Sequence, residues 1–548
     1  LRRQVMQTMQ TEHGIQLKTT DSLNRRWHGN PQTLVYDSEG IKACLKRLDQ
    51  PIYVVKERER IGFTNEGYES PTGAAPLAAA ALPLRPEQLG DATFREAYGV
   101  KLAYAAGAMA NAIASVELVT AMGRAGLLSS FGSAGVVGGR LEAVIQQVQA
   151  ALGAAPYAFN LIHSPSEEAM ERRAVELFLQ YGVRIVEASA FLDLTPHVVR
   201  YRAAGLSLDA QGQPVIGNRI IAKVSRREVA QKFMEPAPDR LLQPLVAAGL
   251  ITAAQMEIAR HIPMADDVTV EADSGGHTDN RPLVVILPSI LSLRDELQAK
   301  HQFTAPVRVG AAGGIGTPSA ALAALTMGAA YVVTGSLNQS CVEAGASPYT
   351  KKLLSEADMA DVMMAPAADM FEMGVKVQLL KRGTMFPMRA QRLYELYREY
   401  DSVDAIPLVE REKLEKQVLK RPIDEIWRET VAYFMERDPE QIRRAEDNPK
   451  RKMALIFRWY LGLSSRWSNT GEAGRELDYQ IWCGPSMGAF NAWVKGSYLQ
   501  EPANRSVVDV AWQIMTGAAY LYRVQSLKLQ GVTFAPMYES QPLTPSGA

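Results

Sequence analysis

The stretch EADSGGHTDN, residues 271–280, combines residue types that suit acid–base chemistry at a turn. Residues 268–271 are rich in β-branched side chains and predict a buried strand. Gly275 and Gly276 allow a sharp turn or a close approach to a ligand, because glycine has no Cβ. His277 follows, and its unperturbed pKa lies near neutrality. This order is typical of the catalytic rim of an α/β barrel, whereas a hairpin with a surface histidine is the simpler alternative.

A second glycine-rich segment, residues 308–337, predicts a phosphate site. One predicted strand runs into a glycine turn, a helix begins near Pro318, and a second strand ends in another glycine turn. Free backbone N–H groups beside strand ends bind phosphate, and many barrels form a phosphate cup from the loops after strands 7 and 8. Ordinary tight turns are the alternative. The predicted phosphate ligands are Gly313, Gly314, Thr334, Gly335 and Ser336.

Other polar positions near predicted strand ends are candidates for contact with a flat ligand. Residues 103–115 are rich in small side chains, which would suit a ring lying on the backbone or close packing of a helix on the sheet. Asn160 could bond a ring carbonyl or N–H group, or form a turn. Lys223 is either solvated or aimed at an electron-rich ring or a phosphate. We expect His163 and Cys341 to be structural.

Short apolar runs alternate with helical patterns between residues 100 and 345 and predict an α/β fold with a parallel sheet. Eight strands over about 240 residues favour a (β/α)8 TIM barrel. A doubly wound open sheet is the alternative, but the first βα turn has no GxGxxG. Ser164 and Glu167 predict a capping box at one helix. FMN would fit the barrel rim, with His277 over it. The expected strands are 101–105, 126–131, 157–162, 183–189, 219–224, 268–272, 307–311 and 330–335.

Three regions are expected along the chain. Residues 1–95 read as an irregular N-terminal cap or leader with short strands, such as one at residues 52–55, and the Ala- and Pro-rich residues 74–84 predict a linker. Residues 96–345 form the barrel. Residues 346–548 have apolar residues at three- and four-residue spacing, which predicts a large helical addition. Within it, the Met-rich residues 364–383 predict a flexible lid over an acyl chain, or ordinary core packing.

The composition excludes several classes of protein. Lys plus Arg and Asp plus Glu both number 59 in the 548 residues, so no overall charge favours nucleic acid. Three cysteines without a CxxC motif or a zinc spacing fit a reducing cytosol and indicate no metal site. The first residues lack the apolar segment of a secretory signal, and no run of about 18 apolar residues predicts a membrane helix. We expect a cytoplasmic protein without nucleic-acid or membrane partners.

Several segments resemble known flavoenzymes. Residues 106–135, with EADSGGH and GAAGGIG, are similar to the nitronate monooxygenase superfamily of FMN barrels, which includes flavin-dependent enoyl-acyl-carrier-protein reductases. Longer segments, among them residues 341–390, 450–472 and IWCGPSMGAFNAWVKGSYL (481–499), resemble the PfaD family. That family comprises discrete enoyl reductases of bacterial polyunsaturated fatty acid synthases, with close relatives that act in trans on polyketide assembly lines.

The PfaD resemblance implies an enoyl-[acyl-carrier-protein] reductase that uses FMN and NADPH, or NADH, on 2-enoyl thioesters. It implies acyl carrier protein domains as partners and a homodimer. His277 would orient the thioester carbonyl and supply a proton, and Lys223 would stabilise reduced flavin. A nitronate monooxygenase-type flavoenzyme and a non-catalytic scaffold subunit are the alternatives. The implied FMN contacts are Gly107, Ala108, Met109, Asn160, Lys223, Ser274, Gly275, Gly276, Gly313, Gly314, Thr334, Gly335 and Ser336.

Basic clusters in the sequence are candidates for docking an acidic carrier protein. Solvated helix faces are the simpler interpretation of any one of them. The clusters are residues 223–227, 351–352, 381–382, and 450–452 with Arg458.

Overall fold

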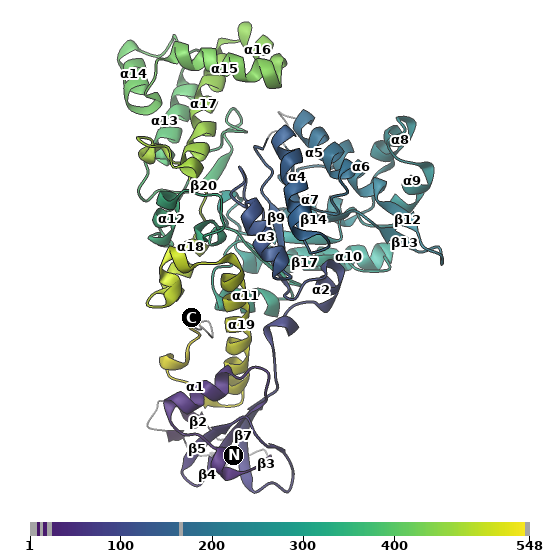
Figure 1. The fold of residues 1–548 in the computed structure, drawn as a ribbon, viewed down its shortest axis with the longest axis vertical. Helices are drawn as coiled ribbons and strands as arrows, with labels where there is room; N and C mark the ends of the chain where they lie inside the picture. Colours follow the sequence, from purple (N-terminus) through teal and green to yellow (C-terminus); the bar gives the residue numbers. More distant parts are fainter. Residues whose placement is uncertain (1–7, 11–14, 19–24, 137, 164–167, 543–548) are drawn as a thin grey trace, which may run out of the picture.

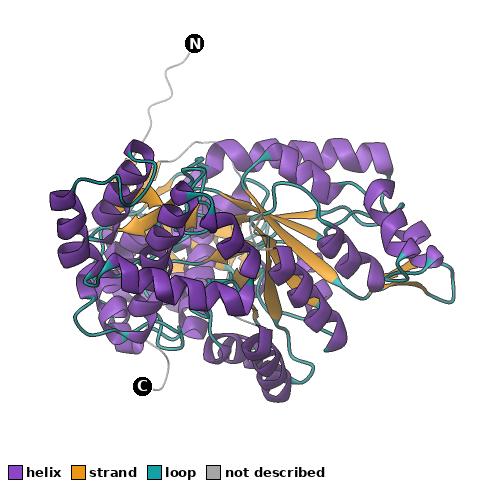
Figure 2. Cartoon of the chain, turned by 90° about the horizontal axis from the view of Figure 1, so that it is seen from above, coloured by secondary structure: helices purple, strands orange, loops and turns teal. Residues whose placement is uncertain are grey.

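Eight parallel strands close into a barrel in a computed structural model that describes residues 8–10, 15–18, 25–136, 138–163 and 168–542. The strands follow one another around the barrel in chain order, and the last pairs with the first. Helices surround them (Figure 2). The predicted TIM barrel is therefore confirmed. Its strands are β8 (Tyr104–Ala106), β9 (Leu128–Phe131), β10 (Ala158–Ile162), β11 (Ile185–Ser189), β14 (Arg219–Val224), β15 (Asp267–Glu271), β17 (Arg308–Ala312) and β18 (Val332–Thr334).

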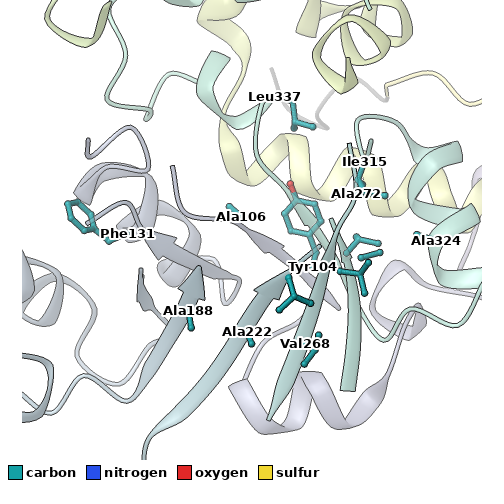
Figure 3. Packing of buried hydrophobic residues seen from close by; sticks show 14 of the residues in the cluster. Tyr104, Ala106, Phe131, Ala188, Ala222, Val268, Ala272, Ile315, Ala324 and Leu337 are labelled. Atoms are coloured by element: carbon teal, nitrogen blue, oxygen red, sulfur yellow. The ribbon is translucent and has the colours of Figure 1, made fainter. Parts of the chain in front are cut away.

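Helices between the strands cover the outer face of the barrel. Small strand residues such as Ala222 and Val268 are fully buried in this layer, and Figure 3 shows them with Ala324 of the helix before β18. The capping box expected at Ser164 and Glu167 lies outside the described residues. The helices are α3 (Val116–Arg124), α4 (Gly138–Leu152), α5 (Glu168–Gln180), α6 (Pro196–Ala204), α7 (Arg227–Met234), α8 (Asp239–Ala247), α9 (Ala253–Ala259), α10 (Leu283–His301) and α11 (Pro318–Thr326).

Helix α2 (Ala92–Tyr98) packs its aromatic residues against the side chains at the N-terminal ends of the barrel strands. Phe94 stacks on Tyr331 with ring centroids 4.1 Å apart. The Tyr98 hydroxyl donates to Asp267, and Arg308 donates two bonds of 2.7 Å to the same carboxylate. This polar and aromatic packing fills the barrel at the N-terminal ends of its strands. The C-terminal ends, where barrel enzymes place their chemistry, remain for a ligand.

The N-terminal region contains a sheet, and the short strand expected at residues 52–55 belongs to it. The prediction of a linker at residues 74–84 is wrong, because β7 lies between β3 and β4 in a five-stranded sheet. Leu77 and Ala79 alternate inward, but alanine has little strand propensity, and only the pairing partners specify the strand. The strands are β3 (Arg26–His28), β4 (Ile52–Glu57), β5 (Arg60–Thr64), β6 (Tyr68–Glu69) and β7 (Ala75–Ala81).

Helix α19 (Val507–Leu529) connects the barrel with the N-terminal sheet, running from α11 to α1 (Ser38–Lys46) and β7 (Figure 1). Arg523 is 1% exposed on this helix. Its guanidinium donates hydrogen bonds to five carbonyl oxygens between Cys44 and Gln50. Two of these carbonyls lie in the last turn of α1 and three follow its end, where a helix leaves its last acceptors without partners.

The C-terminal addition is mainly helical, as expected, but it also contains a hairpin. Residues 364–383 form most of this hairpin, in which β19 (Val362–Pro366) pairs with β20 (Lys376–Leu380). Helices α13 to α17 form a lobe beside the barrel (Figure 1). Across the described residues, every helix is too short or too polar to cross a membrane. The helices are α12 (Pro348–Ser355), α13 (Phe386–Glu399), α14 (Leu408–Lys413), α15 (Ile423–Arg437), α16 (Pro439–Glu446), α17 (Pro449–Thr470) and α18 (Ser486–Val494).

Replacing Arg523 by Met should loosen the N-terminal sheet, because buried carbonyls after α1 would lose their donor. We expect the free energy of unfolding to fall by about 2–3 kcal/mol, the scale of a buried acceptor without a partner. Thermal melting and limited proteolysis within residues 25–83 would measure this. Lys528→Met, an exposed change on the same helix, should leave both unchanged. If the Arg523 variant melts and is cleaved in the same way as the wild type, then Arg523 does not hold the N-terminal sheet on α19.

Candidate active site

His277 lies on the short strand β16 (Gly276–His277), just after the sixth barrel strand. The hairpin of the C-terminal addition holds this strand, with Gly276 paired to Gln378 and His277 to Val377. The Gln378 amide also donates a 2.8 Å hydrogen bond to the backbone oxygen of Ser274. The turn that the sequence singled out is therefore positioned by residues about a hundred positions further along the chain.

The loop of the same hairpin brings Asp369 to His277. Imidazole Nε2 lies 3.2 Å from carboxylate Oδ1, and the two side chains are 38% and 37% exposed. Burial by itself lowers the pKa of His277, but the hydrogen bond and charge of Asp369, with a contribution from Glu271, outweigh it and raise that pKa above its ordinary value. His277 is thus protonated more often at neutral pH than an isolated histidine.

Three charged side chains meet at the mouth of the barrel. Lys223 Nζ lies 3.6 Å from Glu187 Oε1 and 3.4 Å from Glu271 Oε1. The Glu187 carboxylate also accepts from the backbone N–H of Ala108 at 3.3 Å. Burial lowers the pKa of Lys223, but the two carboxylates outweigh it and raise the pKa, so the ammonium group keeps its charge.

The two carboxylates were not predicted from the sequence. Glu187 is the single charged residue of β11, and Glu271 is the charged residue at the carboxyl end of β15. A buried acid costs free energy unless it is paired, so that isolation was a usable signal. Asp369 had no comparable signal, because it lies in a loop of ordinary composition.

Two predicted ligand contacts direct polar groups into the protein. Asn160 Nδ2 donates to the backbone oxygen of Glu187 at 3.0 Å and to Ser189 Oγ at 2.8 Å. Thr334 is 1% exposed, and its hydroxyl bonds Asn338 within the barrel. The carbonyl oxygen of Thr334 is also occupied, because it accepts from the backbone N–H of Gly107 and from Asn338 Nδ2. The polar side chains of both residues are therefore already bonded inside the protein.

The glycines predicted to contact the ligand fall into two groups, according to whether a side chain at that position would clash with the chain or enter open space. A Cβ on Gly275 would lie 2.8 Å from the backbone nitrogen of Cys483, and one on Gly313 would lie 2.6 Å from the backbone carbon of Ala272. These two glycines therefore allow close packing of the chain on itself. At the open positions, a Cβ would meet no heavy atom of the described residues within 4 Å, which leaves room for an anion beside backbone N–H groups. The open positions are Gly276, Gly314 and Gly335.

Gly107 at the first barrel turn belongs with the packed group, because a Cβ there would lie 3.0 Å from Val333 Cγ1. The backbone of the nearby Met109 is also tightly packed, since a Cβ on Gly132 would lie 1.7 Å from the backbone oxygen of Met109. This first turn therefore presents a tightly packed backbone surface, as its small residues indicate.

A loop from far along the chain closes over the two phosphate-type turns. The backbone N–H of Gly484 donates to Ser336 Oγ at 3.0 Å. On the other turn, a Cβ at Gly316 would lie 2.3 Å from the backbone oxygen of Ser486, the first residue of α18. Residues 482–486 thus touch both turns, a relation that the local sequence did not predict.

His163 and Cys341, expected to be structural, have partners that fit this role. His163 Nδ1 lies 2.7 Å from the buried carboxylate of Glu171, and its ring stacks on Phe191. Cys341 is fully buried, and burial raises the pKa of its thiol, which keeps it unreactive. No group of His, Cys, Asp and Glu residues within the described ranges is arranged to hold a metal ion.

Three regions of the chain match models of known protein families. A model described as nitronate monooxygenase matches residues 96–395, more than half of the chain. A model described as the fatty acid synthase subunit PfaD N-terminal domain matches residues 27–83, the N-terminal sheet. A third, described as the inserted helical domain of [acyl-carrier-protein] S-malonyltransferase, matches residues 400–479 in the helical lobe.

Individual relatives agree with these matches. One polyunsaturated fatty acid synthase subunit of Thraustochytrium sp. is 50% identical over 497 residues, 89% of this chain and 33% of that protein. Polyketide biosynthesis protein PksE of Bacillus subtilis is 46% identical, over 80% of this chain and 58% of its own length. The chain thus spans less than two thirds of the curated relatives it matches.

A solved structure is also similar. The enoyl reductase domain of MlnA, from the macrolactin biosynthesis cluster of Bacillus amyloliquefaciens, superposes with a TM-score of 0.77 and 38% sequence identity. The match covers 80% of this chain and 99% of that domain. Most of the chain therefore shares the architecture of that domain.

Asp369→Asn should lower the pKa of His277, because asparagine keeps a polar side chain but supplies no negative charge against the effect of burial. Titration of the imidazole by NMR would measure this, and the seven histidines of the chain keep assignment simple. Asp279→Asn is the matched control, since Asp279 bonds Ser225 and Arg226 instead. An unchanged pKa of His277 in the Asp369 variant would contradict the assignment.

Proposed function

Because this chain belongs to the nitronate monooxygenase family and matches the PfaD N-terminal domain, we propose that it is a trans-acting enoyl reductase for 2-enoyl thioesters on acyl carrier proteins. Similarity to the MlnA enoyl reductase domain supports the reaction, and similarity to synthase subunits supports the pathway class, polyunsaturated fatty acid or polyketide biosynthesis. The observation that carries the proposal is the His277–Asp369 pair, a proton donor held at the barrel rim.

The residues present fit FMN as the cofactor. Gly314 and Gly335 leave open space beside backbone N–H groups at the ends of the seventh and eighth strands, where its phosphate would bind. Lys223 provides a cation at the barrel mouth, beside which an electron-rich ring would be stabilised. Bound there, FMN would accept a hydride from NADPH and pass one to the β-carbon of the enoyl thioester.

The chain's own residues would manage the proton and the negative charge of this reaction. Asp369 binds His277 through Nε2, which leaves Nδ1 for the substrate. A protonated His277 can hydrogen-bond the thioester oxygen and give a proton to the α-carbon, so that hydride and proton together yield the saturated thioester. Glu187 and Glu271 hold Lys223 in place, and its charge offsets the negative charge that develops nearby.

A nitronate monooxygenase reaction would use the same barrel and the same histidine. The hairpin and helical lobe favour the larger substrate, because a small nitroalkane does not need an addition of this size paired with the turn at His277. A flavin-free scaffold subunit would not need open phosphate-type turns at Gly314 and Gly335. Purified protein without bound flavin would favour that scaffold alternative.

Gly335→Val should weaken flavin binding, because the new side chain would fill the open space at the last barrel turn. The backbone there needs no left-handed conformation, so the fold should tolerate the change. Flavin content after purification, measured by absorbance, should fall well below the wild type. Gly462→Val, on the exposed side of α17, also enters open space and should keep full flavin content. Equal flavin in both variants would contradict the phosphate assignment.

His277→Ala should retain flavin but reduce enoyl reduction by about 10²–10⁴-fold, the range for loss of a general acid. The assay follows NADPH consumption with a short 2-enoyl thioester on a carrier protein, at equal flavin content. His261→Ala, a surface histidine 69% exposed, is the control and should have wild-type turnover. Unchanged turnover in the His277 variant would overturn its catalytic role.

A further inference from the structure

Helix α18 belongs to the C-terminal addition, but it begins against the two turns of the proposed phosphate site. Just before its first residue, the backbone N–H of Gly484 donates to Ser336 Oγ in the turn after the eighth barrel strand at 3.0 Å. In the turn after the seventh strand, a Cβ on Gly316 would collide with the backbone oxygen of Ser486, the first residue of the helix. The start of α18 therefore lies beside the same two turns that leave open space for an anion.

The first turn of α18 has no side-chain cap among the residues that the structure describes. Its N-cap residue is Pro485, whose ring offers no acceptor to the N–H groups that a helix leaves without partners at its start. The helix after the seventh strand differs, because Thr317 caps α11 by accepting from the N–H of Ala320 at 3.2 Å. Compared with α11, α18 therefore has more of its N-terminal donor capacity left for a ligand.

Ser486 adds a side-chain donor at the same place. The residue is 8% exposed, and its hydroxyl has no hydrogen-bond partner in the described part of the chain. A buried hydroxyl without a partner costs free energy, so such groups generally meet a ligand or a water molecule. The side chain faces the turn after the seventh strand, because its Cβ lies 3.2 Å from the position that a Cβ on Gly316 would take.

Contacts further along α18 fix the place where this helix begins. The buried Arg505 donates to Asn491 Oδ1 in α18 at 3.1 Å and to Ser340 Oγ, shortly after the eighth barrel strand, at 3.0 Å. Its guanidinium also lies 5.1 Å from the ring centre of Phe490 in the same helix. Because Arg505 joins α18 to the segment after the eighth strand, the donors at the helix start are held in place before a ligand binds, which lowers the entropic cost of binding.

The charge of an anion at this place would have to be offset without a charged side chain from the surrounding turns. Residues 312–317, 334–337 and 484–487 contain no Lys, Arg, Asp or Glu. Backbone N–H groups, hydroxyl groups and the positive end of a helix dipole are then the groups that can bind a phosphate. The start of α18, which has no side-chain cap and lies beside two glycine turns, provides all three.

We infer that α18 is a third component of the phosphate site, in which the Ser486 hydroxyl and the first N–H groups of the helix bind the phosphate monoester of the flavin. This inference rests on the proposed FMN cofactor and extends its site from the barrel into the C-terminal addition. On this assignment, the two barrel turns alone do not form a complete phosphate site. The addition then completes the cofactor site and also holds the turn of His277.

Ser486→Ala tests the site in the full chain after bound flavin has been removed. FMN and riboflavin share one ring system, but only FMN carries a phosphate, so their dissociation constants separate the phosphate from the ring. We expect the dissociation constant of FMN to rise about tenfold to a hundredfold, the scale of a lost hydrogen bond to a charged group, and that of riboflavin to stay unchanged. Quenching of flavin fluorescence would measure both. Ser207→Ala, which changes an exposed serine in the hairpin before β14, is the matched control and should alter neither constant.

Ser486→Asp separates phosphate binding from a purely structural role by the sign of its effects. A carboxylate in the first turn stabilises a helix through its dipole, so the melting temperature of the flavin-free protein should stay the same or rise. The same charge would repel a phosphate, so FMN binding should weaken by about a hundredfold or more, while riboflavin binding is retained. FMN affinity equal to that of the wild type in this variant would overturn the assignment.

Two results with Ser486→Ala would also overturn it. An equal loss of affinity for FMN and riboflavin would mean that Ser486 acts on the fold, and unchanged affinity for FMN would mean that the barrel turns bind the phosphate alone. None of these titrations needs turnover. If the protein binds FMN but reduces no enoyl thioester, the reductase proposal fails, and the titrations still decide whether α18 holds the phosphate.

Discussion

The hydrogen bond between His277 and Asp369 joins the barrel to the C-terminal addition, and the candidate site depends on it. It exists because β20 pairs with β16 directly after the sixth barrel strand, which places the hairpin loop over the histidine. The same contact raises the pKa of His277 and lowers that of Asp369, so the pair favours a protonated imidazole. The loop that carries Asp369 also lines a cleft beside the helical lobe.

The charges at the barrel mouth complete this arrangement. An isolated buried ion would lose more solvation than the protein returns, so Lys223 is stable there only between Glu187 and Glu271. Glu271 also acts on His277, which links the two groups electrostatically. In the proposed reaction, the cation and the proton donor would therefore be in place before a substrate binds, and transition-state charge would be stabilised without rearrangement of the site.

The eight barrel strands were predictable because apolar runs and glycine turns are local signals, and the position of His277 followed from the same pattern. Strand β7 was missed because alanine carries no strand signal of its own. Asp369 was missed because it meets His277 across 92 residues of sequence. The glycines show a further limit, since the sequence cannot separate Gly313, which packs on the chain, from Gly335, which leaves open space.

In the proposed reaction, electrons pass from flavin to a carrier-bound enoyl group at His277. The direct measurement is anaerobic: the purified protein is reduced with NADPH, then mixed with a short 2-enoyl thioester on a carrier protein while the absorption of oxidised flavin is followed. We expect rapid return of this absorption and formation of the saturated thioester. Absorption that stays bleached with the thioester, but returns with oxygen and a nitronate, would contradict a reductase and indicate a monooxygenase.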